Sequence, residues 1–386
     1  RALVFTAMVT SKISFALQYV GVNVPRQRGL RRGAPLRVLF SSTREDTAPI
    51  RREDVAPSRV EAVEVRGRRI FVKRDDKYRL PETGLCGNKA RKLYSLNNLS
   101  PFPQDLVSHG GPQSNAMVAL AAVVHRHQPS STFTYYTKPI PRWLRNNPSG
   151  NFARAISLGT EIRTLSVAEY QDLFGGLGAI SGAPPGLPLP PGALWVPQGG
   201  ASAEAEPGLI RLADEIYAQV EASSELAGGP VNVVVASGSG ATALFLARHL
   251  HPHGIGVTAV PCVMRGGAFL RQMERLDEMT GSHGILPSIL EGKEHIPFGQ
   301  PSPLLLDAWT EMKQIGLYVD LLYGARTWQV LLEHWDAGSM PPSLGPGTNV
   351  LYYHCGGIEG VSTQLNRYKH AGLVSEIHYN AYFEGI

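Results

Sequence analysis

The feature that most constrains the fold is a continuous apolar run that ends in glycines and leads directly into an apolar helix pattern. Residues 231–250 read VNVVVASGSGATALFLARHL. An unbroken valine-rich run predicts a strand buried on both faces, and such strands occur in parallel sheets that helices cover. The glycines predict a tight turn between the strand and the helix. The segment therefore predicts a strand-loop-helix unit of an α/β fold.

Similar patterns recur along the chain. Strand patterns alternate with helix patterns from residue 105 to residue 166 and again from 193 to 355, without an internal repeat. Alternating apolar and polar residues on both sides of Arg66-Gly67 predict a hairpin, and the Gly/Pro-dense residues 174–192 predict a loop. We therefore predict an α/β fold of two open, twisted parallel-sheet domains with flanking helices and a cleft between them.

Charge is distributed unevenly. The formal net charge is +5, but residues 1–44 contain eight Arg or Lys and no Asp or Glu, so the remainder is mildly acidic. This distribution argues against a nucleic-acid partner. This basic leader, residues 1–50, acid-free up to residue 44, is typical of a mitochondrial or plastid presequence; a disordered leader on a cytoplasmic protein is the alternative. No uninterrupted apolar segment predicts a membrane span.

The three cysteines, Cys86, Cys262 and Cys355, are far apart and form no CxxC pair. This spacing argues against a metal site and against a disulfide framework.

The strongest local motif is Ser237-Gly238-Ser239-Gly240-Ala241-Thr242, between the apolar strand and its helix. Backbone amides, hydroxyls and a helix N-terminus at such a turn can hold a phosphate monoester. The motif matches neither nucleotide fingerprint, and glycine turns also begin many helices that bind nothing. If a phosphate binds here, an aspartate in place of Gly240 should weaken its binding more than it weakens folding.

Two further motifs point to a reaction on an amino acid. Gln113, Ser114 and Asn115 crowd the predicted start of a helix, where a substrate carboxylate could bind; simple capping is the alternative. Lys89 follows Gly87-Asn88 at another helix start, and a solvated surface lysine is the alternative there. An amine, a phosphate anchor and a carboxylate site without a metal together indicate pyridoxal phosphate chemistry.

The sequence also resembles a known family. Five blocks, GNKARKL, GGPQSNAM, SGSGAT, YVDLLYG and YHCGG, are similar in order and spacing to those of the 1-aminocyclopropane-1-carboxylate deaminase and D-cysteine desulfhydrase family, over about residues 55–375. The resemblance implies the fold of pyridoxal-phosphate enzymes of fold type II, similar to the tryptophan synthase β-subunit, in a homodimer. With it we assign residues 1–50 to the leader, 51–92 and 197–386 to a large cofactor-binding domain, and 93–196 to a small domain.

The resemblance also implies roles for residues on the substrate side. Lys89 would form the Schiff base with the cofactor and then act as an acid/base at the substrate carbon. Ser114 would be a second acid/base or a carboxylate contact, Gln113 would help to hold the carboxylate, and Tyr323 would lie beside the substrate.

Other implied roles concern the cofactor. Residues 237–242 would bind its phosphate, Asn115 would lie near its phenolic oxygen, and Cys355 would face its pyridine nitrogen. Family members have Thr or Leu in place of Cys355, and Glu or a small hydroxyl residue in place of Gly324. No carboxylate for the ring nitrogen is therefore expected at position 324.

The function implied is a deaminating lyase for a small amino acid, most simply β-elimination from D-cysteine to pyruvate, ammonia and sulfide. The alternatives are deamination of the cyclopropane amino acid, β-replacement by an added nucleophile, and a protein that binds pyridoxal phosphate without turnover.

Overall fold

The computed structural model describes residues 55–175 and 182–375, which belong to one compact unit. The predicted presequence, residues 1–50, lies outside the described residues. Within the described ranges, no helix combines the length and apolar character that crossing a membrane requires.

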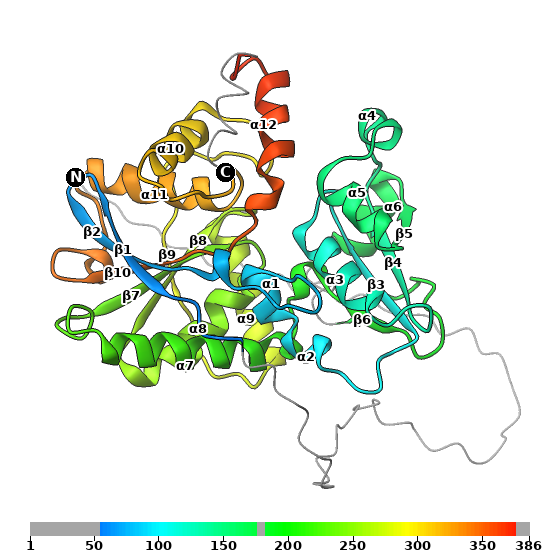
Figure 1. Ribbon diagram of the computed structural model, residues 1–386, viewed down its shortest axis with the longest axis horizontal. Coiled ribbons are helices and arrows are strands. Elements are labelled where there is room, and N and C mark those ends of the chain that lie inside the picture. The colour runs from blue at the N-terminus through cyan, green and yellow to red at the C-terminus, as the bar shows by residue number, and fades with distance from the viewer. Residues whose placement is uncertain (1–54, 176–181, 376–386) are drawn as a thin grey trace, which may run out of the picture. The chain divides into compact units, whose positions relative to one another are not determined.

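A six-stranded sheet forms the larger part of the fold (Figure 1). Its strands, in spatial order, are β1 (Val60–Val65), β2 (Arg68–Lys73), β10 (Asn349–Tyr353), β7 (Val231–Ser237), β8 (Gly256–Pro261) and β9 (Ser288–Ile289). β1 and β2 are antiparallel, and every other neighbouring pair is parallel. The predicted hairpin is confirmed: Arg66 and Gly67 have φ values of 49° and 71° in a two-residue turn.

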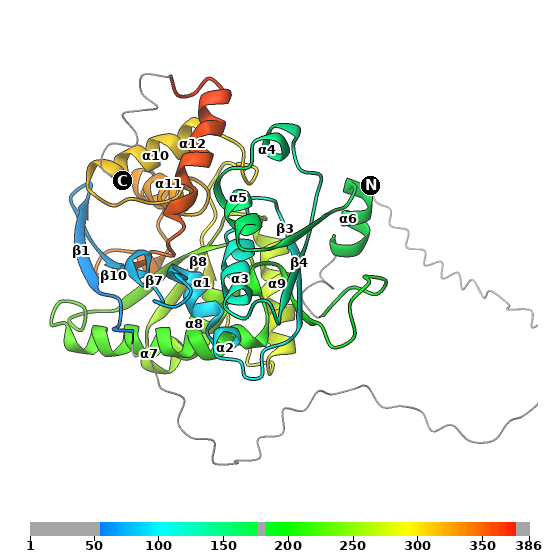
Figure 2. The same ribbon diagram turned by 45° about the vertical axis from the view of Figure 1, so that its right-hand side comes forward.

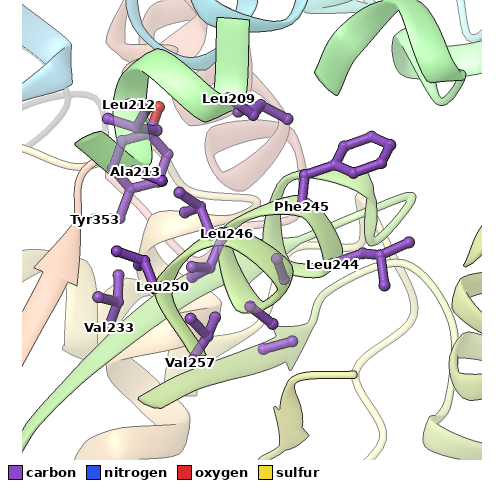
Figure 3. Packing of buried hydrophobic residues seen from close by; sticks show 14 of the residues in the cluster. Leu209, Leu212, Ala213, Val233, Leu244, Phe245, Leu246, Leu250, Val257 and Tyr353 are labelled. Atoms are coloured by element: carbon purple, nitrogen blue, oxygen red, sulfur yellow. The ribbon is translucent and has the colours of Figure 1, made fainter. Parts of the chain in front are cut away.

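Helices cover both faces of this sheet, so that its strands are buried as their apolar sequences predict. One face packs against α7 (Glu206–Ala222), α8 (Ala241–Leu250) and α9 (Gly266–Met279). The other packs against α10 (Pro303–Gln314), α11 (Gly324–Asp336) and α12 (Val361–His370). In the first core, Leu209 and Leu212 of α7 meet Leu246 and Leu250 of α8 over Val233 of β7 (Figure 3).

A second, four-stranded sheet is entirely parallel. Its order is β5 (Glu161–Thr164), β4 (Thr132–Thr137), β3 (Asp105–Gly110) and β6 (Leu194–Val196). Its core on one side includes α3 (Asn115–His125) and α5 (Gly150–Ser157), which lie side by side (Figure 2), and on the other side α6 (Val167–Phe174). The remaining helices are α1 (Gly87–Lys92), α2 (Tyr94–Asn97) and α4 (Arg142–Asn146).

The structure differs from the sequence predictions in detail. α6 was not predicted, although Ser166 and Glu169 form a capping box that fixes its start. The predicted loop 174–192 begins at the end of α6, whose last residue is Phe174 and whose C-cap is Gly175. Residues 182–192 form no helix or strand, as predicted, and residues 176–181 lie outside the described residues. The division into a large and a small domain stays a prediction.

Candidate active site

The predicted site residues come together around one cavity of about 790 Å³. Ala241 is the exception, because its side chain is fully buried in the core of α8 and does not line the cavity. The other predicted residues that line it are Lys89, Gln113, Ser114, Asn115, Ser237, Gly238, Ser239, Gly240, Thr242, Tyr323 and Cys355.

Lys89 is held on a short helix, α1, that packs against the end of β10. Gly87 has a φ of 58°, and a side chain there would collide with the carbonyl of Cys355, so glycine permits this close approach. The backbone N–H of Asn88 donates a hydrogen bond to the same carbonyl at 3.0 Å. The GNK sequence therefore fixes the lysine beside Cys355.

A buried ion cluster anchors the same helix. The guanidinium of Arg91, 3% exposed, donates to Asp75 at 2.9 Å and to Glu215 at 2.6 Å. Tyr353 of β10 also donates its hydroxyl hydrogen to Asp75 at 2.8 Å. These charge-assisted bonds tie α1 to β10 and α7, and this limits the motion of Lys89.

Two lysines of α1 face the cavity, and sequence reasoning found only one of them. Lys92 is buried and its Nζ lies 3.4 Å from the hydroxyl of Ser239. Burial lowers the pKa of Lys89, and burial together with Lys89 lowers the pKa of Lys92 well below its usual range. The spacing of three residues on a helix could have revealed Lys92, because such residues share a face.

The loop from Ser237 to Thr242 is held at both ends. Gly240, at φ 82°, begins α8, and the hydroxyl of Thr242 donates to Asn88 at 2.9 Å. Gln272 donates its side-chain N–H to the carbonyl of Ser239 at 2.6 Å. The hydroxyl of Ser237 donates back to Val235 at 3.1 Å and is occupied within its own strand. The loop is thus preformed at the start of a helix.

The expectation for Gly240 needs correction. A Cβ at Gly240 would lie 2.6 Å from Cγ of Met273 and 3.2 Å from the ring of Phe269, in the core rather than in the cavity. An aspartate there would bury a charge among apolar groups and disrupt folding. Of the two glycines in this loop, both of which line the cavity, Gly238 is the one whose Cβ would face the site, 3.2 Å from the ring of Tyr323.

Ser114 both caps the N-terminus of α3 and lines the cavity. The hydroxyl oxygen of Ser114 accepts hydrogen bonds from the N–H groups of Ala116 at 3.2 Å and Met117 at 3.3 Å. Its hydroxyl also interacts with the buried phenol of Tyr135, which donates to the carbonyl of Gly111 at 3.3 Å. With both acceptor positions of Ser114 occupied, its hydrogen is free to point at Tyr135.

The amides of Gln113 and Asn115 have protein partners. Gln113 donates to Ser149 at 3.1 Å and accepts from the N–H of Phe152 at 3.2 Å, so its side chain holds the start of α5. Asn151, which sequence reasoning missed, donates to the side-chain oxygen of Asn115 at 2.6 Å and thereby fixes that amide.

Tyr323 and Cys355 border the cavity from the large sheet side. The Tyr323 ring lies 5.3 Å from that of Phe298, centroid to centroid. Burial raises the pKa of the Tyr323 phenol and of the Cys355 thiol, so both are neutral near pH 7. Among the described residues, no group of His, Cys, Asp and Glu could hold a metal ion.

The structure shows a further carboxylate beside Tyr323, that of Asp320, which the sequence analysis did not identify. Asp320 is 4% exposed and lines the cavity, and its oxygens accept backbone hydrogen bonds from Leu322, Tyr323 and Gly324 at 2.8–2.9 Å. Burial raises its pKa, although these bonds oppose the shift. Gly324 itself is packed, since a Cβ would lie 2.6 Å from Cβ of Val319. Asp320 therefore shapes the turn before α11.

No protein-family model and no curated protein matches the sequence. Solved structures do match. An ACC deaminase homologue covers 81% of this chain and 94% of its own, with a TM-score of 0.61 and 18% identity. O-ureido-L-serine synthase covers 85% of this chain and 97% of its own, with a TM-score of 0.53 and 13% identity. Threonine deaminase isoform 2 from Solanum lycopersicum covers 79% of this chain and 83% of its own, with a TM-score of 0.51 and 13% identity.

At these identities the likeness concerns the fold. The fold is shared with the matched structures over most of both chains. The predicted fold class is confirmed: the chain has the α/β fold of fold type II, that of the pyridoxal-phosphate enzymes.

Proposed function

We propose that this protein is a pyridoxal-phosphate-dependent lyase that deaminates a small amino acid, most simply D-cysteine. The observation that carries the proposal is that Lys89, the loop 237–242 and the start of α3 all line one cavity. These elements come from three separate parts of the chain, and at one cavity they could supply an amine, a phosphate-binding loop and a carboxylate-binding helix start.

The residues present fit the cofactor. Lys92 is a buried amine without a carboxylate partner among the described side chains, and it lies beside the loop at the start of α8. A phosphate dianion would supply the missing counter-charge, with the loop amides and the helix N-terminus as further donors. Lys89 would bind the aldehyde, Asn115 would lie near the phenolic oxygen, and Cys355 would face the ring nitrogen.

When bound, pyridoxal phosphate supplies an electron sink that lowers the cost of removing a proton from the substrate α-carbon. The Nζ of Lys89, whose pKa is lowered by burial, would take that proton. Ser114 would hold the substrate carboxylate or exchange a proton on the opposite side, and Tyr323 would cover the substrate. The carbon-sulfur bond then breaks, sulfide leaves, and addition of water to the three-carbon fragment gives pyruvate and ammonia.

A substrate panel tests this proposal. Purified protein with cofactor is incubated with D-cysteine, L-cysteine, D-serine and the cyclopropane amino acid, and the oxo acid is assayed. Pyruvate from D-cysteine supports the proposal. A new amino acid on addition of an external thiol would indicate β-replacement, and cofactor binding without any turnover would indicate a binding protein. A homodimer and an organellar location remain predictions.

A further inference from the structure

His354 immediately precedes Cys355 in the YHCGG motif, and the proposed reaction gives it no part. Its side chain is 1% exposed and does not line the cavity. Both ring nitrogens nevertheless have backbone partners. Nε2 lies 2.7 Å from the carbonyl oxygen of Tyr318, and Nδ1 lies 3.2 Å from the backbone nitrogen of Gly356. The buried ring therefore joins two segments that are far apart in the sequence.

The two partners of His354 select one form of the ring. A carbonyl oxygen can only accept and a backbone N–H can only donate, so Nε2 carries the hydrogen and Nδ1 accepts. Two carboxylates lie near the ring, but other donors already bind them. Asp76 is 4.0 Å from Nε2, and Arg74 donates to its two oxygens at 2.9 and 2.6 Å. The oxygens of Asp320 accept from backbone N–H groups. In the neutral ring these bonds fix one tautomer and one orientation.

The Gly356 bond holds the turn that follows β10. Gly356 and Gly357 have φ values of 77° and 86°, and both line the cavity. A Cβ on Gly356 would lie 3.3 Å from Cα of Gly87. A Cβ on Gly357 would lie 3.0 Å from the side-chain nitrogen of Asn115. The turn thus contacts both α1, which carries Lys89, and the start of α3.

The Tyr318 bond holds the segment that leads to Tyr323. Tyr318 stands two residues before Asp320, whose carboxylate accepts hydrogen bonds from three consecutive backbone N–H groups, that of Tyr323 included. Asp320 and Tyr323 both line the cavity. One imidazole therefore connects the turn that carries Cys355 with the turn that carries Tyr323.

We propose that His354 is a positioning residue, which fixes Lys89 and Cys355 at the cavity through its two backbone hydrogen bonds. This inference rests on the proposed function, because it concerns where that amine and that thiol stand toward the cofactor. Without an acceptor at Nδ1, the buried N–H of Gly356 loses its partner, and the turn is no longer held. The carbonyl of Cys355 accepts from the N–H of Asn88 at 3.0 Å, so a displaced turn displaces Lys89 as well.

Two substitutions separate the two bonds. His354→Asn places an amide oxygen near the position of Nδ1 and can keep the bond from Gly356. His354→Gln reaches one bond farther and can keep only the bond to Tyr318. His334→Gln is the matched control, because both ring nitrogens of His334 also contact backbone oxygens, at 3.1 and 2.8 Å, and this residue does not line the cavity.

Amide hydrogen exchange in the cofactor-free protein is measured first, since it needs neither cofactor nor substrate. In His354→Gln, exchange at Gly356 and Asn88 should be at least about tenfold faster than in the wild type, whereas His354→Asn and His334→Gln should change it less than about threefold. With pyridoxal phosphate bound, His354→Gln should also shift the visible absorption maximum of the cofactor. Its kcat for D-cysteine should fall by about tenfold with KM nearly unchanged.

Wild-type exchange at Gly356 in His354→Gln overturns the inference. Faster exchange with an unchanged cofactor absorption overturns it too, because the bond would then serve the fold alone. If His354→Gln does not fold, His354→Asn decides: wild-type exchange and absorption support the positioning role, and a change in both contradicts it. Absence of turnover with every amino acid overturns the lyase proposal but leaves these two measurements valid, whereas a wild type that binds no pyridoxal phosphate overturns both.

Discussion

The Nζ of Lys92 lies 3.4 Å from the hydroxyl of Ser239, so a buried amine of α1 meets the loop that begins α8. If this loop holds the cofactor phosphate, Lys92→Met removes the charge that balances it while keeping the apolar part of the side chain. We expect the affinity for pyridoxal phosphate to fall roughly 10- to 100-fold, which corresponds to the loss of one charge-assisted hydrogen bond. Titration of the cofactor-free variant, followed by fluorescence, measures this. An unchanged Kd would place the phosphate elsewhere.

The same lysine should affect stability as a function of pH. Its pKa is well below the usual value in the folded protein, so below about pH 10.4 the unfolded chain binds more protons at this position. Stability of the cofactor-free protein should therefore rise with pH from the folded pKa up to that value. Lys92→Met should show a weaker rise, and its stabilisation relative to wild type should be larger at pH 7 than at pH 10. Denaturant unfolding at both pH values decides it; parallel pH dependence of the two proteins would contradict the burial argument.

Tyr135 offers a test of Ser114. Tyr135→Phe keeps the ring that packs in the core but removes the acceptor for the Ser114 hydroxyl hydrogen. We expect kcat to fall by about tenfold, or about 1.4 kcal/mol in barrier, with little change in substrate binding. Tyr136→Phe is the control, because Tyr136 belongs to the core on the other face of the sheet. In a Ser114→Ala background the effect of Tyr135→Phe should vanish; an additive loss would show that the phenol acts independently of Ser114.

The sequence predicted the fold well because several parallel strands, such as β3, β7 and β10, carry their own signal, an apolar run that leads into a glycine turn. Local sequence motifs also singled out Lys89 and the loop 237–242, whose residues, apart from Ala241, line the cavity. Lys92, Asn151 and Asp320 were missed because their roles depend on contacts between distant segments, such as the Asn151–Asn115 hydrogen bond. The expectation for Gly240 failed for the same reason: only the fold shows that its Cβ would point at Met273.

The residues beside Tyr323 in the cavity wall lead to a prediction about the choice of substrate. A cyclopropane amino acid has no α-proton, so its opening depends on strong electron withdrawal, which a carboxylate at the cofactor ring nitrogen favours. Here the residue after Tyr323 is Gly324, Asp320 is occupied by three backbone N–H groups, and Cys355 is a neutral thiol. We expect kcat/KM for D-cysteine to exceed that for the cyclopropane substrate by more than about tenfold. The two values are measured side by side at one pH, and the reverse order would refute this prediction. Gly324→Glu cannot serve as a probe, because the position is packed against Val319.

The central claim is that Lys89 binds the cofactor, and borohydride reduction tests it most directly. The protein with pyridoxal phosphate is reduced and digested, and the labelled peptide is identified by mass spectrometry. Lys89→Ala serves as the control; it should keep its fold, shown by an unchanged circular dichroism spectrum, and lose activity by on the order of 10³-fold or more. We predict that the wild type carries the pyridoxyl group on Lys89 and that the variant carries none. A label on Lys92 or another lysine, or no label in the wild type, would contradict the account.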